Sequence, residues 1–211
     1  MKVCEIFASI QGESSYAGLP CVFVRMTGCN LRCSYCDTAY AYYEGTEMTE
    51  DAVLDAVRQY GLKLVEITGG EPLLQEDVKS LARRLLDLGF SVLVETNGTV
   101  DIGDVDDRAV IIMDVKTPGS GNPGSVLVEN FDHLKKGDEL KFVITDRADF
   151  EWSSAFIELH SLAERCAVLF SPEFGKLPPA ELAGWIIEER MPVRFNLQLH
   201  KFIYSPDRRA V

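Results

Sequence analysis

Three cysteines lie within eight consecutive positions, Cys29, Cys33 and Cys36, in the stretch GCNLRCSYCDT (28–38). Thiolates are the preferred ligands of zinc, copper(I) and iron–sulfur clusters. The C-x3-C-x2-C spacing is too compact for the three ligands to come from separate helices or strands. We therefore expect one loop that wraps a single metal centre.

The missing fourth ligand separates two kinds of metal site. A structural zinc site usually has four protein ligands. The histidines, His133, His160 and His200, lie far from the cysteines in the sequence, so a zinc site would need a distant fourth ligand. A cubane iron–sulfur cluster ordinarily takes one cysteine per iron, and three cysteines would leave one iron open to a substrate or cofactor. The residues alone leave both alternatives open.

Three further motifs lie at the ends of predicted strands: TGGEP (68–72), ETNG (95–98) and MDVK (113–116). Gly69 and Gly70 let the backbone approach a ligand closely, and Glu71 can accept a hydrogen bond from an ammonium group. Each motif taken alone is also typical of an ordinary turn or surface loop. Because the carboxyl ends of strands carry the ligand sites of such folds, we expect the motifs to surround one site.

Alternating strands and helices position these motifs. Short apolar runs predict strands over 21–26, 64–68, 91–96, 109–115, 140–145, 167–171 and 193–198. Amphipathic spacing predicts helices over 49–60, 75–89, 150–165 and 179–189. This alternation is typical of an α/β fold with a parallel sheet covered by helices. A full eight-unit barrel needs about 250 residues, so we expect a partial, open β/α barrel that forms a single domain over 1–211.

Composition argues against several classes of protein. The net charge of −12 disfavours a nucleic-acid partner. We find no signal peptide, and the longest unbroken apolar run, AVIIM from Ala109, is too short to cross a membrane. We therefore expect a cytoplasmic protein. Six cysteines in such a protein indicate metal or redox chemistry rather than disulfides, and the isolated Cys4, Cys21 and Cys166 receive no role.

The cysteine motif, with Tyr35 before its last cysteine, resembles that of the radical S-adenosylmethionine (SAM) enzymes. TGGEP is similar to the motif with which that superfamily holds the amino group of SAM. The resemblance implies a 4Fe–4S cluster held by Cys29, Cys33 and Cys36, with SAM bound to the fourth iron. It also assigns the chemistry to the 5′-deoxyadenosyl radical released from SAM, so no side chain is given a catalytic role of its own.

The stretch SIQGESSYAGLPCVFVRMTGCNLRCSYCDT (9–38), together with TGGEP, ETNG and QLHKF (198–202), resembles the 7-carboxy-7-deazaguanine synthases over nearly the whole chain. This family converts 6-carboxy-5,6,7,8-tetrahydropterin into 7-carboxy-7-deazaguanine with release of ammonia, in queuosine and deazapurine biosynthesis. The resemblance implies that Mg²⁺ is required and that SAM is regenerated. The chain departs from the family pattern at Ser14, where glycine is more common, and at DVK (114–116).

The same resemblance assigns site residues. It implies that Ile10, Gln11, Gly12, Arg25 and Thr68 bind the substrate and that Thr38 binds Mg²⁺. It implies contacts to SAM at Tyr35, Cys36, Asp37, Gly70, Glu71, Asn97, Asp114, Val115 and Lys116. Gln198, His200 and Lys201 either line the substrate pocket or form a surface cluster at the end of a strand.

The resemblance further implies a homodimer and a protein electron donor such as flavodoxin or ferredoxin. Two other functions stay open at this point. One is a different radical SAM enzyme, such as an activase that generates a glycyl radical on a partner protein, although such activases lack the QGE and FVR segments before the cysteines. The other is a non-catalytic binding module stabilised by zinc.

Overall fold

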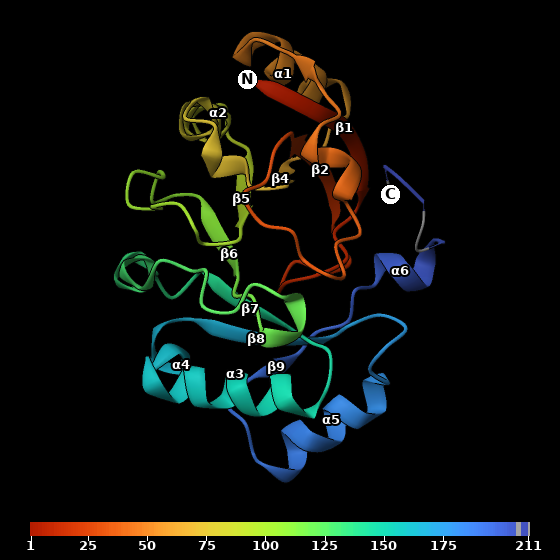
Figure 1. Ribbon diagram of the computed structural model, residues 1–211. Helices are drawn as coiled ribbons and strands as arrows, with labels where there is room; N and C mark the ends of the chain where they lie inside the picture. The colour runs from red at the N-terminus through yellow and green to blue at the C-terminus, as the bar shows by residue number, and fades with distance from the viewer. Residues whose placement is uncertain (206–207, 211) are drawn as a thin grey trace.

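The computed structural model describes residues 1–205 and 208–210. These residues form one nine-stranded sheet with the order β3-β1-β2-β4-β5-β6-β7-β8-β9. The strands are β1 (Lys2–Ile10), β2 (Pro20–Met26), β3 (Thr46–Glu47), β4 (Leu64–Gly69), β5 (Ser91–Thr96), β6 (Val110–Asp114), β7 (Glu139–Ile144), β8 (Ala167–Pro172) and β9 (Arg194–Phe195). The sheet curves but does not close, because β3 and β9 remain its two edges (Figure 1).

Strand direction divides the sheet into two parts. From β2 to β9 each strand is parallel to its neighbour. The strand β1 pairs antiparallel with both β2 and β3. The carboxyl ends of β2 and β4 to β8 therefore meet at one edge of the sheet, where the loops after them come together.

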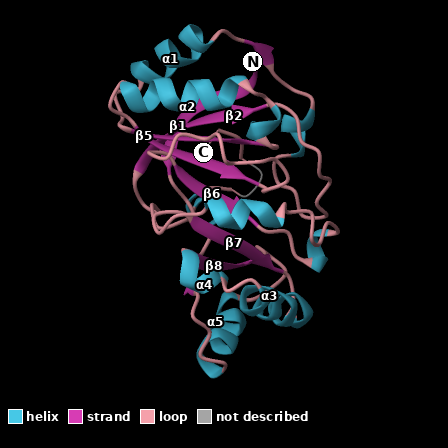
Figure 2. Ribbon diagram, turned by 90° about the vertical axis from the view of Figure 1, so that its left-hand side faces the viewer, coloured by secondary structure: helices cyan, strands magenta, loops and turns pink. Residues whose placement is uncertain are grey.

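The helices are α1 (Glu50–Gln59), α2 (Asp77–Asp87), α3 (Arg147–Leu159), α4 (Leu162–Arg165), α5 (Pro179–Glu188) and α6 (His200–Ile203), with short 3-10 turns at η1 (Ala39–Tyr42), η2 (Pro72–Leu74), η3 (Pro118–Ser120) and η4 (Val128–His133). Helices α1 to α5 cover the outer face of the sheet, while the short α6 lies at the cavity. In Figure 2, α1 and α2 lie at one end of the sheet and α3, α4 and α5 at the other. None of the helices in the described ranges combines the length and apolar character needed to span a membrane.

Local sequence signals explain where these helices begin. The Thr49 side chain accepts a hydrogen bond from the Ala52 N–H at 3.2 Å, and acidic residues occupy the first turn of α1. Asp146 caps α3 in the same way through the Asp149 N–H at 3.0 Å. Pro179 stands in the first turn of α5, where a missing N–H costs no helical hydrogen bond.

The two faces of the inner strands differ in chemistry because successive side chains point to opposite sides. On β4, Val65 and Ile67 pack into the main core beneath the helices. Between them, Glu66 points to the inner face, as Thr68 does, and both are buried. A small apolar cluster closes the inner face near the amino ends of the strands, and it comprises Phe7, Cys21, Phe23, Leu64, Leu93 and Ile112. The polar inward positions lie above this floor.

The expected open β/α barrel is confirmed, with three differences in its elements. The strands β1 and β3 were not predicted, so the sheet is mixed rather than wholly parallel. The helix predicted over 150–165 is two helices, because Ser161 adopts a left-handed backbone conformation (φ 51°) between α3 and α4. The strand predicted over 193–198 is limited to Arg194–Phe195, and the chain then leaves the sheet toward α6.

Candidate active site

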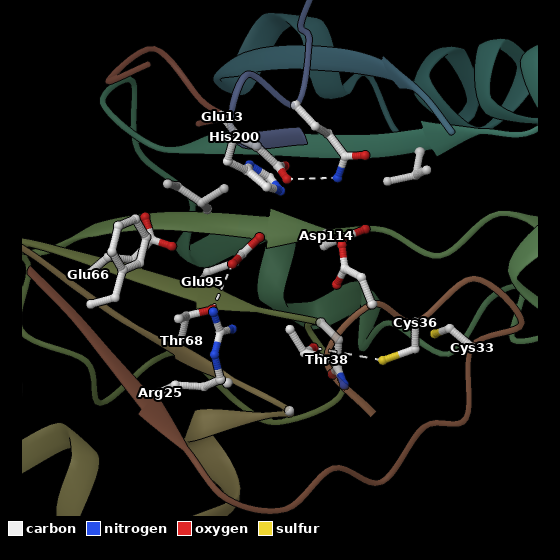
Figure 3. Close-up of a pocket in the computed structure, with 18 of the residues that line it drawn as sticks. Glu13, Arg25, Cys33, Cys36, Thr38, Glu66, Thr68, Glu95, Asp114 and His200 are labelled. Atoms are coloured by element: carbon white, nitrogen blue, oxygen red, sulfur yellow. Dashed lines mark hydrogen bonds between the residues drawn. The ribbon is translucent and has the colours of Figure 1, made fainter. Parts of the chain in front are cut away.

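A cavity of about 470 Å³ opens at the carboxyl ends of the strands, a volume typical of small-molecule sites. It reaches from the cysteine loop to the polar inner face of β4, β5 and β7 (Figure 3). Every site residue expected from the sequence lines this cavity except Gly12, Glu71 and Val115. Gln198, His200 and Lys201 also line it, so the alternative that they form only a surface cluster is not supported.

Backbone hydrogen bonds hold the start of the cysteine loop against η1 and against the TGGEP segment. The Gly28 N–H donates to the Ala41 carbonyl at 2.9 Å, and the Glu71 N–H donates to the Gly28 carbonyl at 2.8 Å. A Cβ at Gly70 would overlap the Gly28 carbonyl oxygen and the Cys29 side chain. Glycine at position 70 is therefore required for the two loops to touch.

The three thiols line one wall of the cavity and are half-buried. The Asn97 side-chain amide lies 3.9 Å from the Cys29 sulfur, and the Asn122 amide lies 3.7 Å from the Cys33 sulfur. The Cys36 sulfur is 3.8 Å from the Thr38 hydroxyl. Burial raises the pKa of Cys29 and of Cys33.

This donor set fits an iron–sulfur cluster with one open iron. It supplies three sulfurs from one loop, with amide groups near two of them, and such amide donors tune cluster potential. Among residues 1–205 and 208–210, no group of three or more His, Cys, Asp or Glu side chains already converges closely enough to hold a metal ion. The thiols thus share a wall without meeting at a common point.

The Glu71 side chain differs from expectation. It is fully buried and does not face the cavity. Its carboxylate accepts hydrogen bonds from the Leu73 N–H (3.0 Å), the Asn97 N–H (2.6 Å) and the Thr96 hydroxyl (2.8 Å). These donors occupy both oxygens, so the side chain fastens the TGGEP loop to the end of β5 and is not available to an ammonium group of SAM. We correct this assignment.

Two unsatisfied polar atoms lie at the cysteine end of the cavity, one at the end of β6 and one in the cysteine loop. Lys116 lies 2.8 Å from Asp114 and 6.0 Å from the centre of the Tyr35 ring. The Asp114 Oδ1 atom and the Tyr35 hydroxyl are buried without a hydrogen-bond partner in the described residues. An unsatisfied buried polar group costs about 1–3 kcal/mol, so a polar ligand here would be stabilised. Val115 instead packs into the main core, and its N–H donates to the Lys141 carbonyl at 2.8 Å.

Other expected residues gather on the opposite side of the cavity. The Arg25 Nε atom lies 2.7 Å from Glu5, and this carboxylate also accepts from the Tyr40 hydroxyl at 2.7 Å. The imidazole of His200 covers the backbone of Gly12, where a Cβ would overlap its Nδ1 atom. Gly12 therefore supports the cavity wall behind His200 rather than lining it.

Ser14 and Asp37 both line the cavity. Ser14 adopts a left-handed conformation (φ 63°), which explains why glycine suits this position.

Burial opposes ionisation of Asp37, but the Lys201 ammonium group at 2.7 Å outweighs it and lowers the pKa of this carboxyl. The Asp37–Lys201 ion pair joins the cysteine loop to α6.

Sequence reasoning missed a charged cluster on the inner face. Lys141 lies 2.7 Å from Glu13, 2.5 Å from Glu95 and 3.4 Å from Asp114. Glu95 also accepts from the Thr68 hydroxyl at 2.7 Å, and Glu66 holds the Gln11 side chain. The available signal was a charge inside an otherwise apolar strand, as in VEIT, LVET and LKFV. Glu66 and Glu95 each stand two positions before a predicted site residue, and thus share its face.

Comparisons with known proteins agree with this architecture. Residues 23–114 match the model of the radical SAM superfamily. The chain is 45% identical to a 7-carboxy-7-deazaguanine synthase of Koribacter versatilis, with 100% of both chains covered. It is 44% identical to a 7-carboxy-7-deazaguanine synthase of Chlorobaculum tepidum, covering 100% of this chain and 97% of that one. The crystal structure of QueE from Escherichia coli superimposes with a TM-score of 0.79 over 94% of each chain, at 21% identity.

Proposed function

Because the chain belongs to the family of 7-carboxy-7-deazaguanine synthases, which are radical SAM enzymes, we propose that it converts 6-carboxy-5,6,7,8-tetrahydropterin into 7-carboxy-7-deazaguanine with release of ammonia. The observation that carries this proposal is a single cavity with thiols at one end and hydrogen-bonding side chains at the other. Such a cavity suits a redox cofactor beside a flat, polar substrate. Neither a glycyl-radical activase nor a zinc module is favoured by any observation at this site.

Family membership brings a 4Fe–4S cluster and SAM as cofactors, and Cys29, Cys33 and Cys36 would hold the cluster. When bound, the two groups supply the one-electron chemistry that abstracts hydrogen from the substrate. Tyr35, Cys36, Asp37, Gly70, Asn97, Asp114 and Lys116 would contact SAM from the cavity wall. The unpaired Tyr35 hydroxyl and Asp114 oxygen support this, since SAM offers polar groups to both.

The substrate would occupy the remainder of the cavity. Arg25 and Thr68 line it, and Glu5 and Glu95 fix their side chains in place. Ile10 and Gln11 form the adjacent wall, and Gly12 supports it. A fixed guanidinium group can pair with the substrate carboxylate or with ring acceptors.

Thr38 would bind Mg²⁺. It stands between the cysteine end and the substrate end of the cavity, and its hydroxyl is a hard oxygen ligand (Figure 3). One hydroxyl is sufficient only because Mg²⁺ usually keeps several waters and shares oxygens with its substrate. The substrate carboxylate would complete the shell, and this would fix the end of the pterin that lies toward Thr38.

The wider setting follows from the same family membership. We propose that residues 1–211 form one radical SAM domain that works as a homodimer in the cytoplasm. The exposed Leu159 and Ile187 side chains on α3 and α5 offer apolar surface to a second copy. The exposed Arg32, between Cys29 and Cys33, offers a cation to an acidic electron donor such as flavodoxin or ferredoxin. Light scattering after size exclusion tests the dimer.

Anaerobic turnover tests the proposed reaction. The cluster-loaded protein is incubated with SAM, reductant, Mg²⁺ and 6-carboxytetrahydropterin, and the products are read by mass spectrometry. We expect a deazapurine carboxylate, one equivalent of ammonia and unchanged total SAM. Unchanged pterin in the presence of an intact cluster would reject the reaction.

A further inference from the structure

Glu66 is the unusual carboxyl group of the cavity. The acidic residues that line the cavity are Glu13, Asp37, Glu66, Glu95, Asp114 and Glu173. All of them except Glu66 lie within 4.0 Å of a lysine nitrogen in the described residues. A buried carboxyl without a cationic partner is costly, which indicates that Glu66 is kept for contact with something else.

Glu66 lies between the small apolar cluster of the inner face and the cavity. Its neighbours in register are Phe23 on β2 and Leu93 on β5, and both belong to the small apolar cluster. The side chain is 3% exposed. Burial raises the pKa of Glu66, and the nearby negative charge of Glu95 raises it further. This setting favours the protonated acid while the cavity is empty, and hydrogen-bond donors that enter the cavity would shift Glu66 toward the carboxylate.

One of the two oxygens of Glu66 is already occupied. Oε2 accepts from the Gln11 side-chain nitrogen, and the Gln11 side-chain oxygen accepts from the Glu13 N–H at 2.8 Å. The Gln11 amide is thus oriented from both ends. No described residue donates to Glu66 Oε1. By contrast, Glu95 engages both oxygens through Lys141 and Thr68, and Glu13 engages both through Lys141 and Gln198.

Glu66 lies at the end of the cavity opposite the cysteines, with Thr38 between them (Figure 3). If the substrate carboxylate lies at Thr38, as the proposed function has it, the pterin ring points toward Glu66. The opposite edge of that ring carries the 2-amino group and the adjacent ring N–H, which are two parallel donors. Oε1 of Glu66 has no donor in the described residues and Oε2 keeps a second lone pair, so the carboxylate can accept from two parallel donors.

We infer that Glu66, oriented by Gln11, is a specificity-determining residue that accepts hydrogen bonds from the aminopyrimidinone edge of the substrate. This inference rests on the proposed function. It assigns Gln11 a positioning role, because both ends of its amide are already engaged by the protein. The enzyme would thereby select 2-aminopyrimidinone compounds over flat heterocycles that lack the amino group.

Glu66→Gln is the informative substitution. The Gln11 nitrogen is fixed, so the new amide would turn its oxygen toward Gln11 and its N–H₂ toward the cavity. The 2-amino group and ring N–H of the substrate would then face the N–H₂ of the new glutamine, and no hydrogen bond could form between them. The change replaces a buried acid with a neutral group of the same shape, so the fold should survive. Glu139→Gln is the matched control, because Glu139 is also buried but does not line the cavity.

Binding is measured by anaerobic titration calorimetry on cluster-loaded protein with SAM and Mg²⁺ but no reductant, so that no turnover occurs. The ligands are 6-carboxytetrahydropterin and its analogue without the 2-amino group. We expect Glu66→Gln to weaken substrate binding about tenfold to a hundredfold, and Glu139→Gln to leave it within about threefold. The wild-type protein should bind the analogue about as weakly as Glu66→Gln binds the substrate. Glu66→Gln should bind the two ligands with equal affinity.

Three results would overturn the inference: wild-type affinity in Glu66→Gln, equal wild-type affinity for both ligands, or a full amino-group preference that persists in the variant. The wild-type comparison of the two ligands decides the matter even if the variant does not fold. A wild-type protein that converts the pterin while Glu66→Gln binds it normally would reject the role of Glu66 alone. A wild-type protein that neither binds nor converts it would reject the proposed function as well.

Discussion

Replacing Lys141 with methionine should destabilise the inner face of the sheet more than any surface substitution. The Lys141 side chain is 4% exposed and lies within hydrogen-bond distance of Glu13 and Glu95. Methionine fills a similar volume but carries no charge. Asp114 would keep Lys116 as its partner at 2.8 Å. Glu13 and Glu95 would remain on the inner face with no cation beside them.

Two estimates of the cost agree. Removing one partner of a buried ion pair costs about 3–5 kcal/mol. Burial alone would raise the pKa of Glu95, but the Lys141 ammonium group, with smaller contributions from the Thr68 hydroxyl and Lys116, lowers it from 4.5 to about 2. That difference corresponds to roughly 3 kcal/mol, since each pKa unit is worth about 1.4 kcal/mol. We therefore expect Lys141→Met to lose about 3 kcal/mol of unfolding free energy at neutral pH.

The pH dependence has a definite sign. A carboxyl whose pKa is lower in the folded state stabilises the fold above its unfolded pKa, and this stabilisation is lost as the pH falls through the folded pKa. For Glu95 this window runs from about 4.5 down to about 2. The difference between the wild-type protein and Lys141→Met should therefore be full above pH 5 and should shrink as the pH falls toward 2.

Anaerobic urea denaturation followed by far-ultraviolet circular dichroism measures this difference, using protein of matched iron content at several pH values. The double variant Lys141→Met/Glu95→Gln should recover part of the loss, because it no longer buries the Glu95 charge. A loss below about 1 kcal/mol, or a loss that does not depend on pH, would refute the reasoning. So would a double variant that is less stable than the single one.

Three further predictions concern the cofactor end of the cavity. Cys33→Ala should abolish the brown colour of the reconstituted protein together with its activity, as read by visible absorption and iron content; a coloured, active variant would exclude Cys33 as a ligand. Thr38→Ala should raise the Mg²⁺ concentration needed for half-maximal turnover by about tenfold, since one of few protein oxygens is lost; an unchanged Mg²⁺ titration would exclude Thr38. Gly70→Ala should push the TGG segment away from Gly28 and weaken SAM binding at least tenfold in equilibrium dialysis, whereas Gly137→Ala, where a Cβ meets open space, should bind SAM normally.

The sequence predicted the parts of the site that local patterns encode. The cysteine motif and the motifs at the ends of β4, β5 and β6 all lie at the carboxyl ends of strands. Because these strands are parallel, their carboxyl ends meet at one edge of the sheet. The apolar, β-branched runs of β4 to β8 are buried on both faces, and such runs give a strong strand signal. These elements could therefore be placed without a structure.

The remainder depends on contacts between distant segments. Glu66 and Lys141 read as interruptions of apolar strands, and only the strand register shows that they face one cavity. The role of Glu71 could not be read from its motif, because the donors that occupy it come partly from Thr96 and Asn97 at the end of β5. His200 and Lys201 reach the cavity only because α6 folds back, so that the Leu199 N–H contacts the Gly12 carbonyl at 2.8 Å.

The alternation along β4 and β5 has a practical consequence for engineering. Val65, Ile67, Val92 and Val94 belong to the packed layer under the helices, while Glu66, Thr68 and Glu95 belong to the cavity. In a saturation library of these strands, adjacent codons should thus produce opposite phenotypes. Changes at the first set reduce the amount of soluble protein. Changes at Glu66 and Thr68 alter which heterocycles are accepted while expression holds, whereas changes at Glu95 also break its ion pair with Lys141 and lower stability. Substrate scope can be redesigned on the cavity face of these strands without changing the face that packs against the helices.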